Sequence, residues 1–130
     1  MIEKDPIEIV SPFETLLDIK VLNIGEGTAR VEKPFKREIT QPSGVVHGGA
    51  ITTLADTASA VALRKLVEPS KQYFTARLEI RFLSTLREGS LVAEAVVVEK
   101  KKRKATVDVK IRNKDGALIA KATAIFLIEK

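Results

Sequence analysis

Residues 47–66 read His47-Gly-Gly-Ala-Ile-Thr-Thr-Leu-Ala-Asp-Thr-Ala-Ser-Ala-Val-Ala-Leu-Arg-Lys-Leu66, and this stretch decides the fold. Its apolar residues recur at steps of three and four, which predicts a helix that continues to about residue 66. Because nearly every side of this helix is apolar or small, we expect it to be buried, with a sheet packed closely against its alanines. The stretch therefore predicts a central helix wrapped by strands. The recurring positions are Ile51, Leu54, Ala55, Ala58, Ala62 and Leu66.

Four segments after this helix alternate between apolar and polar residues, which is typical of strands. They cover residues 73–83, 91–99, 105–112 and 117–128. Turn signals at residues 87–90 and 114–116 separate them, and short connections between sequential strands imply antiparallel pairing. In the first segment one face is expected to carry Phe74, Ala76, Leu78, Ile80 and Phe82.

The residues before the central helix predict a short helix and a hairpin. Ser11 is a good helix cap and Glu14 follows three residues later, which predicts a helix over about residues 12–17. Residues 18–24 and 28–35 alternate again on either side of a glycine-rich turn. Together with the strands that follow, these elements predict a single α+β domain over residues 1–130.

The composition excludes several classes of protein. The chain has no cysteine and one histidine, His47, so disulfide scaffolds, thiolate nucleophiles and multi-histidine metal sites are excluded, and we predict no metal. No apolar run reaches the roughly 20 residues of a membrane span. The start, MIEKDPIEIV, lacks the apolar core of a signal peptide, so we expect a cytoplasmic protein. The net charge of +5 favours an anionic partner.

Asp56 is the first candidate for chemistry, because its carboxylate stands in the middle of an apolar helix. A carboxylate placed there loses solvation and must be paired, hydrogen-bonded or shifted in pKa. One interpretation is a structural aspartate satisfied by a backbone group or an arginine. The other is a general base or nucleophile that opens into a cleft.

The second candidate is the helix start, His47-Gly48-Gly49. The first amides of a helix lack intrahelical partners, and glycines there let a substrate oxygen approach the backbone, although a plain glycine turn would look the same. His47 and Asp56 are nine residues apart and cannot touch along one straight helix, so His47 is expected to orient or hydrogen-bond rather than react. Packing of two subunits could bring one helix start to the Asp56 of the other.

The segment Gly44-Val-Val-His-Gly-Gly-Ala-Ile-Thr-Thr-Leu-Ala-Asp-Thr-Ala58 resembles the helix-start motif of hotdog-fold thioesterases, closest to the PaaI-like branch from phenylacetic acid degradation. The resemblance covers most of the chain. It implies a hotdog fold, with an antiparallel sheet around a long helix, and hydrolysis of an acyl-CoA or aroyl-CoA. It also implies that Asp56 activates the attacking water or attacks the thioester directly, and that the Gly48 amide polarises the thioester carbonyl. By the same resemblance, the two groups come from different subunits of a dimer or a dimer of dimers.

The same resemblance extends to further residues. Gln41 stands where this branch often has an asparagine that contacts the water or substrate, and Thr75 matches a Ser or Thr near the nucleophilic water. Gly49 is expected to contact the substrate beside Gly48. The basic run 100–104 is a solvated turn or a docking site for CoA phosphates through Lys102, Arg103 and Lys104. No separate cofactor is implied, because CoA is part of the substrate.

Two other functions stay open on the sequence alone. A non-catalytic module that binds acyl-CoA or a fatty ligand would use the same fold. A basic, strand-rich RNA-binding domain is disfavoured, because the chain has no tryptophan and only six other aromatic residues to interleave with its basic ones.

Overall fold

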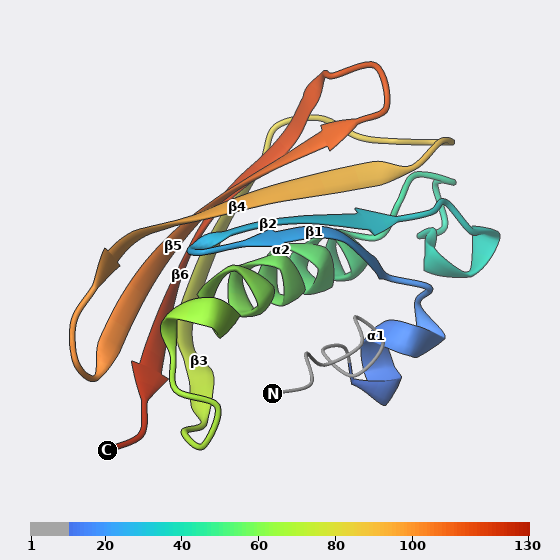
Figure 1. Ribbon diagram of the computed structural model, residues 1–130. Helices are drawn as coiled ribbons and strands as arrows, with labels where there is room; N and C mark the ends of the chain where they lie inside the picture. The colour runs from blue at the N-terminus through green and yellow to red at the C-terminus, as the bar shows by residue number, and fades with distance from the viewer. Residues whose placement is uncertain (1–10) are drawn as a thin grey trace.

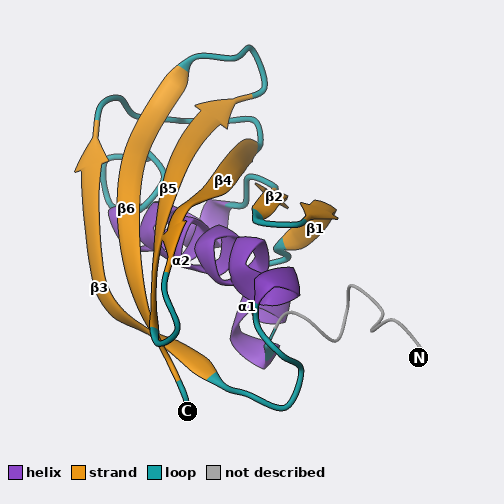
Figure 2. Ribbon diagram, turned by 60° about the vertical axis from the view of Figure 1, so that its left-hand side comes forward, coloured by secondary structure: helices purple, strands orange, loops and turns teal. Residues whose placement is uncertain are grey.

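The computed structural model describes residues 11–130, and the segment MIEKDPIEIV on which the signal-peptide prediction rests lies outside the described residues. Six strands form one antiparallel sheet in the order β1-β2-β4-β5-β6-β3, which curves around helix α2 (Figures 1 and 2). The predicted α+β arrangement is confirmed. The elements are α1 (Pro12–Leu16), β1 (Lys20–Gly25), β2 (Thr28–Lys33), η2 (Arg37–Ile39), α2 (Gly48–Leu63), η3 (Arg64–Leu66), β3 (Tyr73–Phe82), β4 (Leu91–Lys100), β5 (Lys104–Asn113) and β6 (Leu118–Ile128).

Helix α2 supplies the centre of the core. The predicted helix to residue 66 is confirmed, with its last turn tightened into the 3-10 helix η3. The helix packs against β2, β4 and β5, whose core-facing positions hold small side chains such as Ala93, Ala95 and Ala105. Small residues on both sides bring the helix close to the sheet and bury nearly all the apolar surface between them. No described helix is both long and apolar enough to cross a membrane.

One stripe of α2 is not buried, which corrects the expectation of burial on nearly every side. The stripe repeats every four residues, as one face of a helix does. A single curved sheet covers only one side of a helix, and the short helix α1, which contacts α2 at Thr57, leaves this stripe uncovered (Figure 2). Asp56 is therefore half-buried. The stripe consists of Gly48, Gly49, Thr52, Thr53, Asp56 and Ala60.

Strand β3 lies at the edge of the sheet and contains a bulge. Its pairing with β6 shifts between Thr75 and Arg77, so that Ala76 is an extra residue. Leu78 and Ile80 face the core as predicted, but Phe74 is 58% exposed and the prediction of one face from Phe74 to Phe82 is wrong. The bulge reverses the alternation, because one inserted residue turns every side chain before it to the other face.

Tyr73 ties the beginning of β3 to α2. Its hydroxyl donates a hydrogen bond to the carbonyl oxygen of Ala60 at 2.7 Å, and its ring meets Phe126 edge-on at 5.7 Å. Burial raises the pKa of Tyr73 to about 12, because the phenolate would lose its hydration.

This shift predicts a loss of stability in alkali. The folded protein holds the Tyr73 proton up to about pH 12, whereas the unfolded chain releases it near pH 10, so the contribution is complete below pH 10 and lost as pH rises through 12. We expect roughly 3 kcal/mol of the free energy of unfolding to disappear across this window, measured by urea unfolding. Tyr73→Phe cannot ionise and should show a shallower decline. Equal declines in the two proteins would contradict the assignment.

The short helix α1 begins as predicted and is fastened to α2. The Glu14 carboxylate accepts a hydrogen bond from the Ser11 backbone N–H at 3.1 Å, which is the predicted capping arrangement. The other oxygen of Glu14 accepts from the hydroxyl of Thr57 at 3.0 Å. Thr57 follows Asp56 directly, so this bond fixes α1 beside the part of α2 that carries Asp56.

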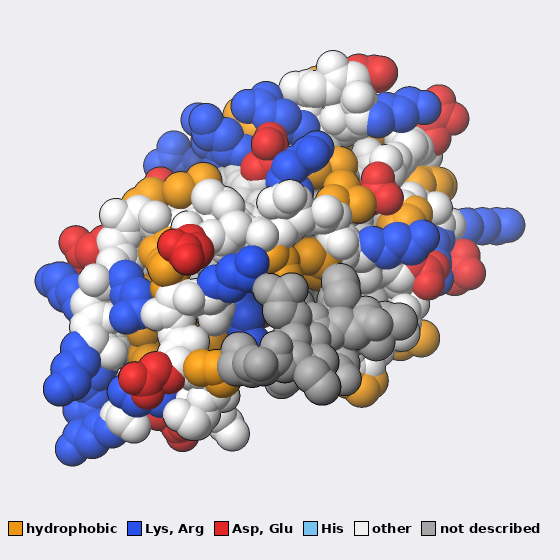
Figure 3. All heavy atoms as spheres, in the orientation of Figure 1, with side chains coloured by type: hydrophobic (Ala, Val, Ile, Leu, Met, Phe, Trp, Pro, Cys, Tyr) orange, Lys and Arg blue, Asp and Glu red, His pale blue; other side chains and the backbone are white. Residues whose placement is uncertain are grey.

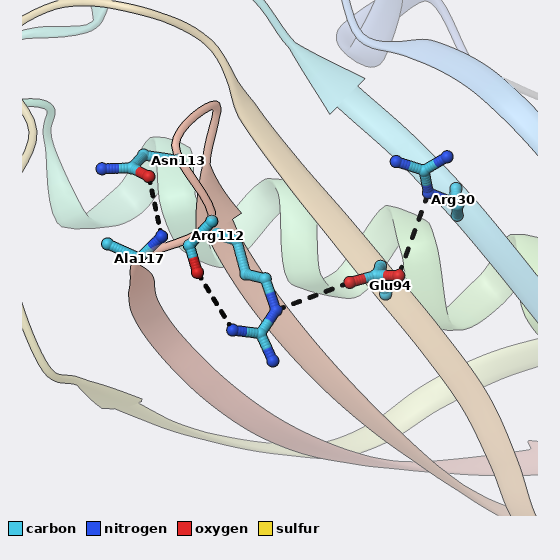
Figure 4. Close-up of polar contacts among 6 residues, drawn as sticks. Arg30, Glu94, Arg112, Asn113 and Ala117 are labelled. Atoms are coloured by element: carbon cyan, nitrogen blue, oxygen red, sulfur yellow. Dashed lines mark hydrogen bonds and ion pairs between the residues drawn. The ribbon is translucent and has the colours of Figure 1, made fainter.

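The outer face of the sheet carries ion pairs that join β2, β4 and β5, close to the β5–β6 hairpin (Figure 4). Glu94 on β4 lies between Arg30 on β2 at 3.9 Å and Arg112 on β5 at 3.6 Å. The predicted hairpin at residues 114–116 is confirmed, with Gly116 in the left-handed region that glycine favours. The Asn113 side chain accepts the Ala117 N–H at 2.9 Å and closes this turn.

Candidate active site

The N-terminus of α2 carries a cap that leaves one amide open. His47 is the N-cap, and its Nδ1 accepts the Gly49 N–H at 2.8 Å while its own backbone N–H donates to Ile39 at 2.6 Å. The Gly48 N–H donates to no group within residues 11–130. His47 thus occupies the Gly49 amide and leaves the Gly48 amide available at the positive end of the helix.

Each of the two glycines lies beside a ring. A Cβ on Gly49 would lie 2.9 Å from Nδ1 of His47, so the cap requires glycine at this position. A Cβ on Gly48 would lie 3.5 Å from the ring of Phe82, at the end of β3. The sequence placed Phe82 only among core-facing residues and gave no sign that its ring reaches the helix start. That contact depends on where β3 ends relative to α2.

The carboxylate of Asp56 is oriented by one hydroxyl. Thr75 donates from Oγ1 to Oδ1 of Asp56 at 2.6 Å. Among the described residues, Asp56 makes no ion pair and no hydrogen bond to a backbone amide, so its second oxygen is open. The bulge at Ala76 turns Thr75 toward the helix and makes this bond possible. A carboxylate held at one oxygen and open at the other is suited to accept a proton or to attack a carbonyl carbon.

Within one chain the structure does not bring Gly48 and Asp56 together. They are eight residues apart on one helix, which is about 12 Å along its axis. Both lie on the unburied stripe of α2 and face the same side. A second copy of the chain is needed to place a Gly48 amide beside an Asp56 carboxylate.

Gln41 lies in the turn that precedes α2. Its side-chain amide donates to the Ser43 hydroxyl at 3.2 Å, and its backbone carbonyl oxygen accepts the Gly44 N–H at 2.8 Å. Arg87, which the sequence gave no reason to select, donates to the Ser43 carbonyl at 2.9 Å and fastens this turn to the loop after β3. Gln41 is exposed and lies six residues before His47.

The predicted basic turn is present between β4 and β5. Lys102, Arg103 and Lys104 are exposed, and Lys and Arg side chains crowd this end of the molecule (Figure 3). Thr75 pairs with Phe126 and Phe126 with Ala105, so the beginning of β5 is two strands from Thr75, about 10 Å across the sheet. The basic turn therefore lies on the Asp56 side of its own chain.

Residues 43–120 match the family model of the Thioesterase superfamily. The chain belongs to this superfamily. Its fold is the hotdog fold, as the resemblance implied. Within residues 11–130 there is no group of three or more His, Cys, Asp or Glu side chains that could hold a metal ion.

Named relatives of this superfamily member include hydrolases. The protein "Putative esterase SSO2140" from Saccharolobus solfataricus is 35% identical over 112 residues, which span 86% of this chain and 79% of the relative. The 1,4-dihydroxy-2-naphthoyl-CoA hydrolase of Listeria monocytogenes is 23% identical over 91% of this chain and 96% of its own. Hydrolase activity at the level of the superfamily is thereby supported.

Solved structures of related proteins superpose over nearly the whole chain. A variant of the phenylacetic acid degradation protein PaaI from Thermus thermophilus has a TM-score of 0.83 and 28% identity, covering 90% of this chain and 98% of that one. The PaaI protein of E. coli has a TM-score of 0.88 and 23% identity, covering 95% of this chain and 88% of that one. At the lower identity, the E. coli protein shows the fold alone.

Proposed function

We propose that this thioesterase-superfamily protein hydrolyses an acyl-CoA or aroyl-CoA to the free acid and CoA. The observation that carries the proposal is the pair of groups on the unburied stripe of α2: a backbone amide without a partner at Gly48 and a carboxylate with one open oxygen at Asp56, both among the described residues. An amide donor stabilises the oxyanion that forms at a thioester carbonyl, and a carboxylate activates water. The CoA-thioester hydrolase among its relatives supports the substrate class.

The two groups would meet in a symmetric dimer. Gly48 and Asp56 lie four residues on either side of Thr52. A two-fold axis beside Thr52 makes the α2 helices of two copies antiparallel and puts each Gly48 next to the Asp56 of the other copy. The stripe consists of small side chains around Asp56, which lets the two helices approach closely.

The edge strand β3 supports the same axis. Thr75 bonds Asp56 and Phe82 contacts Gly48, so β3 runs antiparallel to α2 and its middle, near Leu78, lies level with Thr52. The outer edge of β3 has no strand partner among the described elements. Two such edges would pair antiparallel across the axis and complete a continuous sheet. We propose the dimer as the active unit, and a dimer of dimers as the larger assembly.

The proposed reaction uses one water and leaves no group unbalanced. Acting as a base, Asp56 takes a proton from water, the oxygen attacks the carbonyl carbon, and the Gly48 N–H binds the resulting oxyanion. The C–S bond then breaks, and the thiolate of CoA takes up the proton. Acting as a nucleophile, Asp56 would form an anhydride that water opens with the same products. In a single turnover in ¹⁸O-labelled water, label in the Asp56 carboxyl group would identify the nucleophilic route with water attacking the aspartyl carbonyl carbon, whereas attack at the acyl carbonyl carbon labels only the product acid, as the base route does.

The remaining predicted residues take supporting positions in this proposal. Gln41 would contact the water or substrate from the turn before α2, and Gly49 holds the His47 cap through its N–H. Lys102, Arg103 and Lys104 of the copy that supplies Asp56 would bind CoA phosphates, since ammonium and guanidinium groups suit phosphate by charge and hydrogen-bond geometry. A cytoplasmic location stays a prediction.

The proposal is tested by release of free thiol from a panel of acetyl-, hexanoyl-, benzoyl- and phenylacetyl-CoA. We expect turnover of one or more of these esters well above the uncatalysed rate. Saturable binding of the panel without turnover would instead identify a non-catalytic acyl-CoA-binding module. A protein that neither binds nor hydrolyses these esters would rule out both the hydrolase and the binding module.

The bond between Thr75 and Asp56 gives a smaller test of the same site. Thr75→Val keeps the shape of the side chain but removes the hydroxyl, so Asp56 loses its only hydrogen bond to a described residue. We expect kcat to fall about tenfold, the size of a charge-assisted hydrogen bond, with KM nearly unchanged. Thr75→Ser retains the donor and should retain most of the rate. A Val variant as active as the wild type would show that Thr75 does not orient Asp56.

A further inference from the structure

Phe82 is a half-exposed aromatic ring at the helix start. It is 51% exposed, and its ring lies 3.5 Å from where a Cβ on Gly48 would be. It ends β3 on the same face as Leu78 and Ile80, so its ring points toward α2 rather than to the outer surface. An exposed aromatic ring costs hydration free energy unless something covers it, and this one adjoins the open Gly48 amide.

We infer that Phe82 is the residue on which the acyl group of the substrate packs, and that it sets a preference for neutral, apolar acyl groups larger than acetyl. The inference rests on the proposed function, because it concerns the carbonyl bound at Gly48. The Phe82 ring adjoins Gly48, because a Cβ on Gly48 would lie 3.5 Å from it. We therefore place one of the two substituents on the bound carbonyl carbon over this ring.

The charges decide which substituent passes over the ring. The basic turn lies on the Asp56 side of its own chain, so in the proposed dimer it is carried by the copy opposite the Gly48 and Phe82 that share the site. CoA phosphates are drawn toward that copy. The two substituents of a trigonal carbonyl carbon diverge, so the acyl group extends the other way, over Phe82. A carboxylate at the end of the acyl group would lose hydration there, which disfavours dicarboxylic acyl groups.

The test compares kcat/KM for hexanoyl-CoA with kcat/KM for acetyl-CoA, measured by thiol release. Phe82→Ala is expected to lower this ratio about tenfold, because hexanoyl loses its apolar contact while acetyl is too short to have made it. Phe82→Leu keeps part of the apolar area and should lower the ratio by a smaller factor. It also carries the test if the alanine variant does not fold, as judged by thermal unfolding and sedimentation.

Phe74 provides a matched control on the same strand. It is also a phenylalanine of β3 and is 58% exposed, but the bulge at Ala76 turns it to the outer face. Phe74→Ala should leave the hexanoyl-to-acetyl ratio unchanged. An unchanged ratio in both Phe82 variants would overturn the inference while leaving the hydrolysis intact. A wild-type protein that hydrolyses no CoA ester would overturn the proposed function itself, so the two failures are distinguishable.

Discussion

Replacing Asp56 with asparagine is expected to lower kcat for acyl-CoA hydrolysis by about 10²- to 10⁴-fold, the usual worth of a positioned base. Asparagine keeps an oxygen that can accept the Thr75 hydroxyl, which now binds Asp56 at 2.6 Å. The fold and this hydrogen bond should therefore survive, while the ability to take a proton or attack a carbonyl is lost. The measurement is thiol release at saturating substrate, together with thermal unfolding of both proteins.

Asp108 offers a close control for this substitution. Its carboxylate also accepts a threonine hydroxyl, from Thr123 at 3.1 Å, but on the outer face of the sheet. Asp108→Asn should leave kcat at the wild-type level. If Asp56→Asn retains most of the wild-type rate, Asp56 is neither the base nor the nucleophile, and the central assignment fails.

Replacing Gly48 with proline is expected to lower kcat by about 10²- to 10³-fold, the cost of losing one oxyanion donor. Gly48 is the first residue of α2, where proline is well tolerated because its missing N–H would have no partner in the helix. His47 already has the extended backbone that a residue before proline adopts. The substitution thus removes the amide hydrogen and keeps the helical backbone, while it adds ring carbons beside Phe82.

Gly48→Ala separates the loss of the amide from the addition of a side chain. Its Cβ would make an ordinary contact of 3.5 Å with Phe82, and the N–H would be kept. The alanine variant should be far more active than the proline variant. Similar losses in the two would show that crowding, rather than the missing donor, lowers the rate.

Mixing the two inactive variants tests whether each site draws on both copies. In a mixed dimer of Asp56→Asn with Gly48→Pro, one site carries both defects and the other carries neither. Random exchange of subunits should therefore restore about a quarter of the wild-type activity. No recovery after proven exchange would place Gly48 and Asp56 in the same chain's site, against the 12 Å or so that separates them along α2.

The sequence predicted the helix and strands whose apolar residues recur at regular spacing. Apolar steps of three and four located α2, and alternation located the four strands after it, because periodicity reports a buried face directly. It also singled out Asp56 and the glycines, since a charge within an apolar helix and a glycine pair at its start are local signals. The resemblance added Thr75, which the structure places against Asp56.

What the sequence could not show depends on three-dimensional placement. The unburied stripe of α2 exists because the single sheet covers only one side of the helix. The spacing of apolar residues along a helix does not predict how many sides of it are covered. The contacts of Phe82 with Gly48 and of Arg87 with Ser43 join segments more than thirty residues apart. The bulge at Ala76 was missed because the alternation of apolar and polar residues from Phe74 to Phe82 fits a strand without a bulge equally well.

That bulge decides which residues of β3 face the helix before it and after it. In an unbroken strand with Leu78 and Ile80 inward, Thr75 would project from the back of the molecule and Asp56 would lose its donor. Deleting Ala76 would only remove the extra residue, because Thr75 would still pair with Phe126 and face Asp56; Thr75 turns away only if Ala76 takes a regular place in the ladder. In this architecture the way one residue pairs decides whether the threonine beside it meets the central helix or the solvent, a difference that a count of apolar positions does not register.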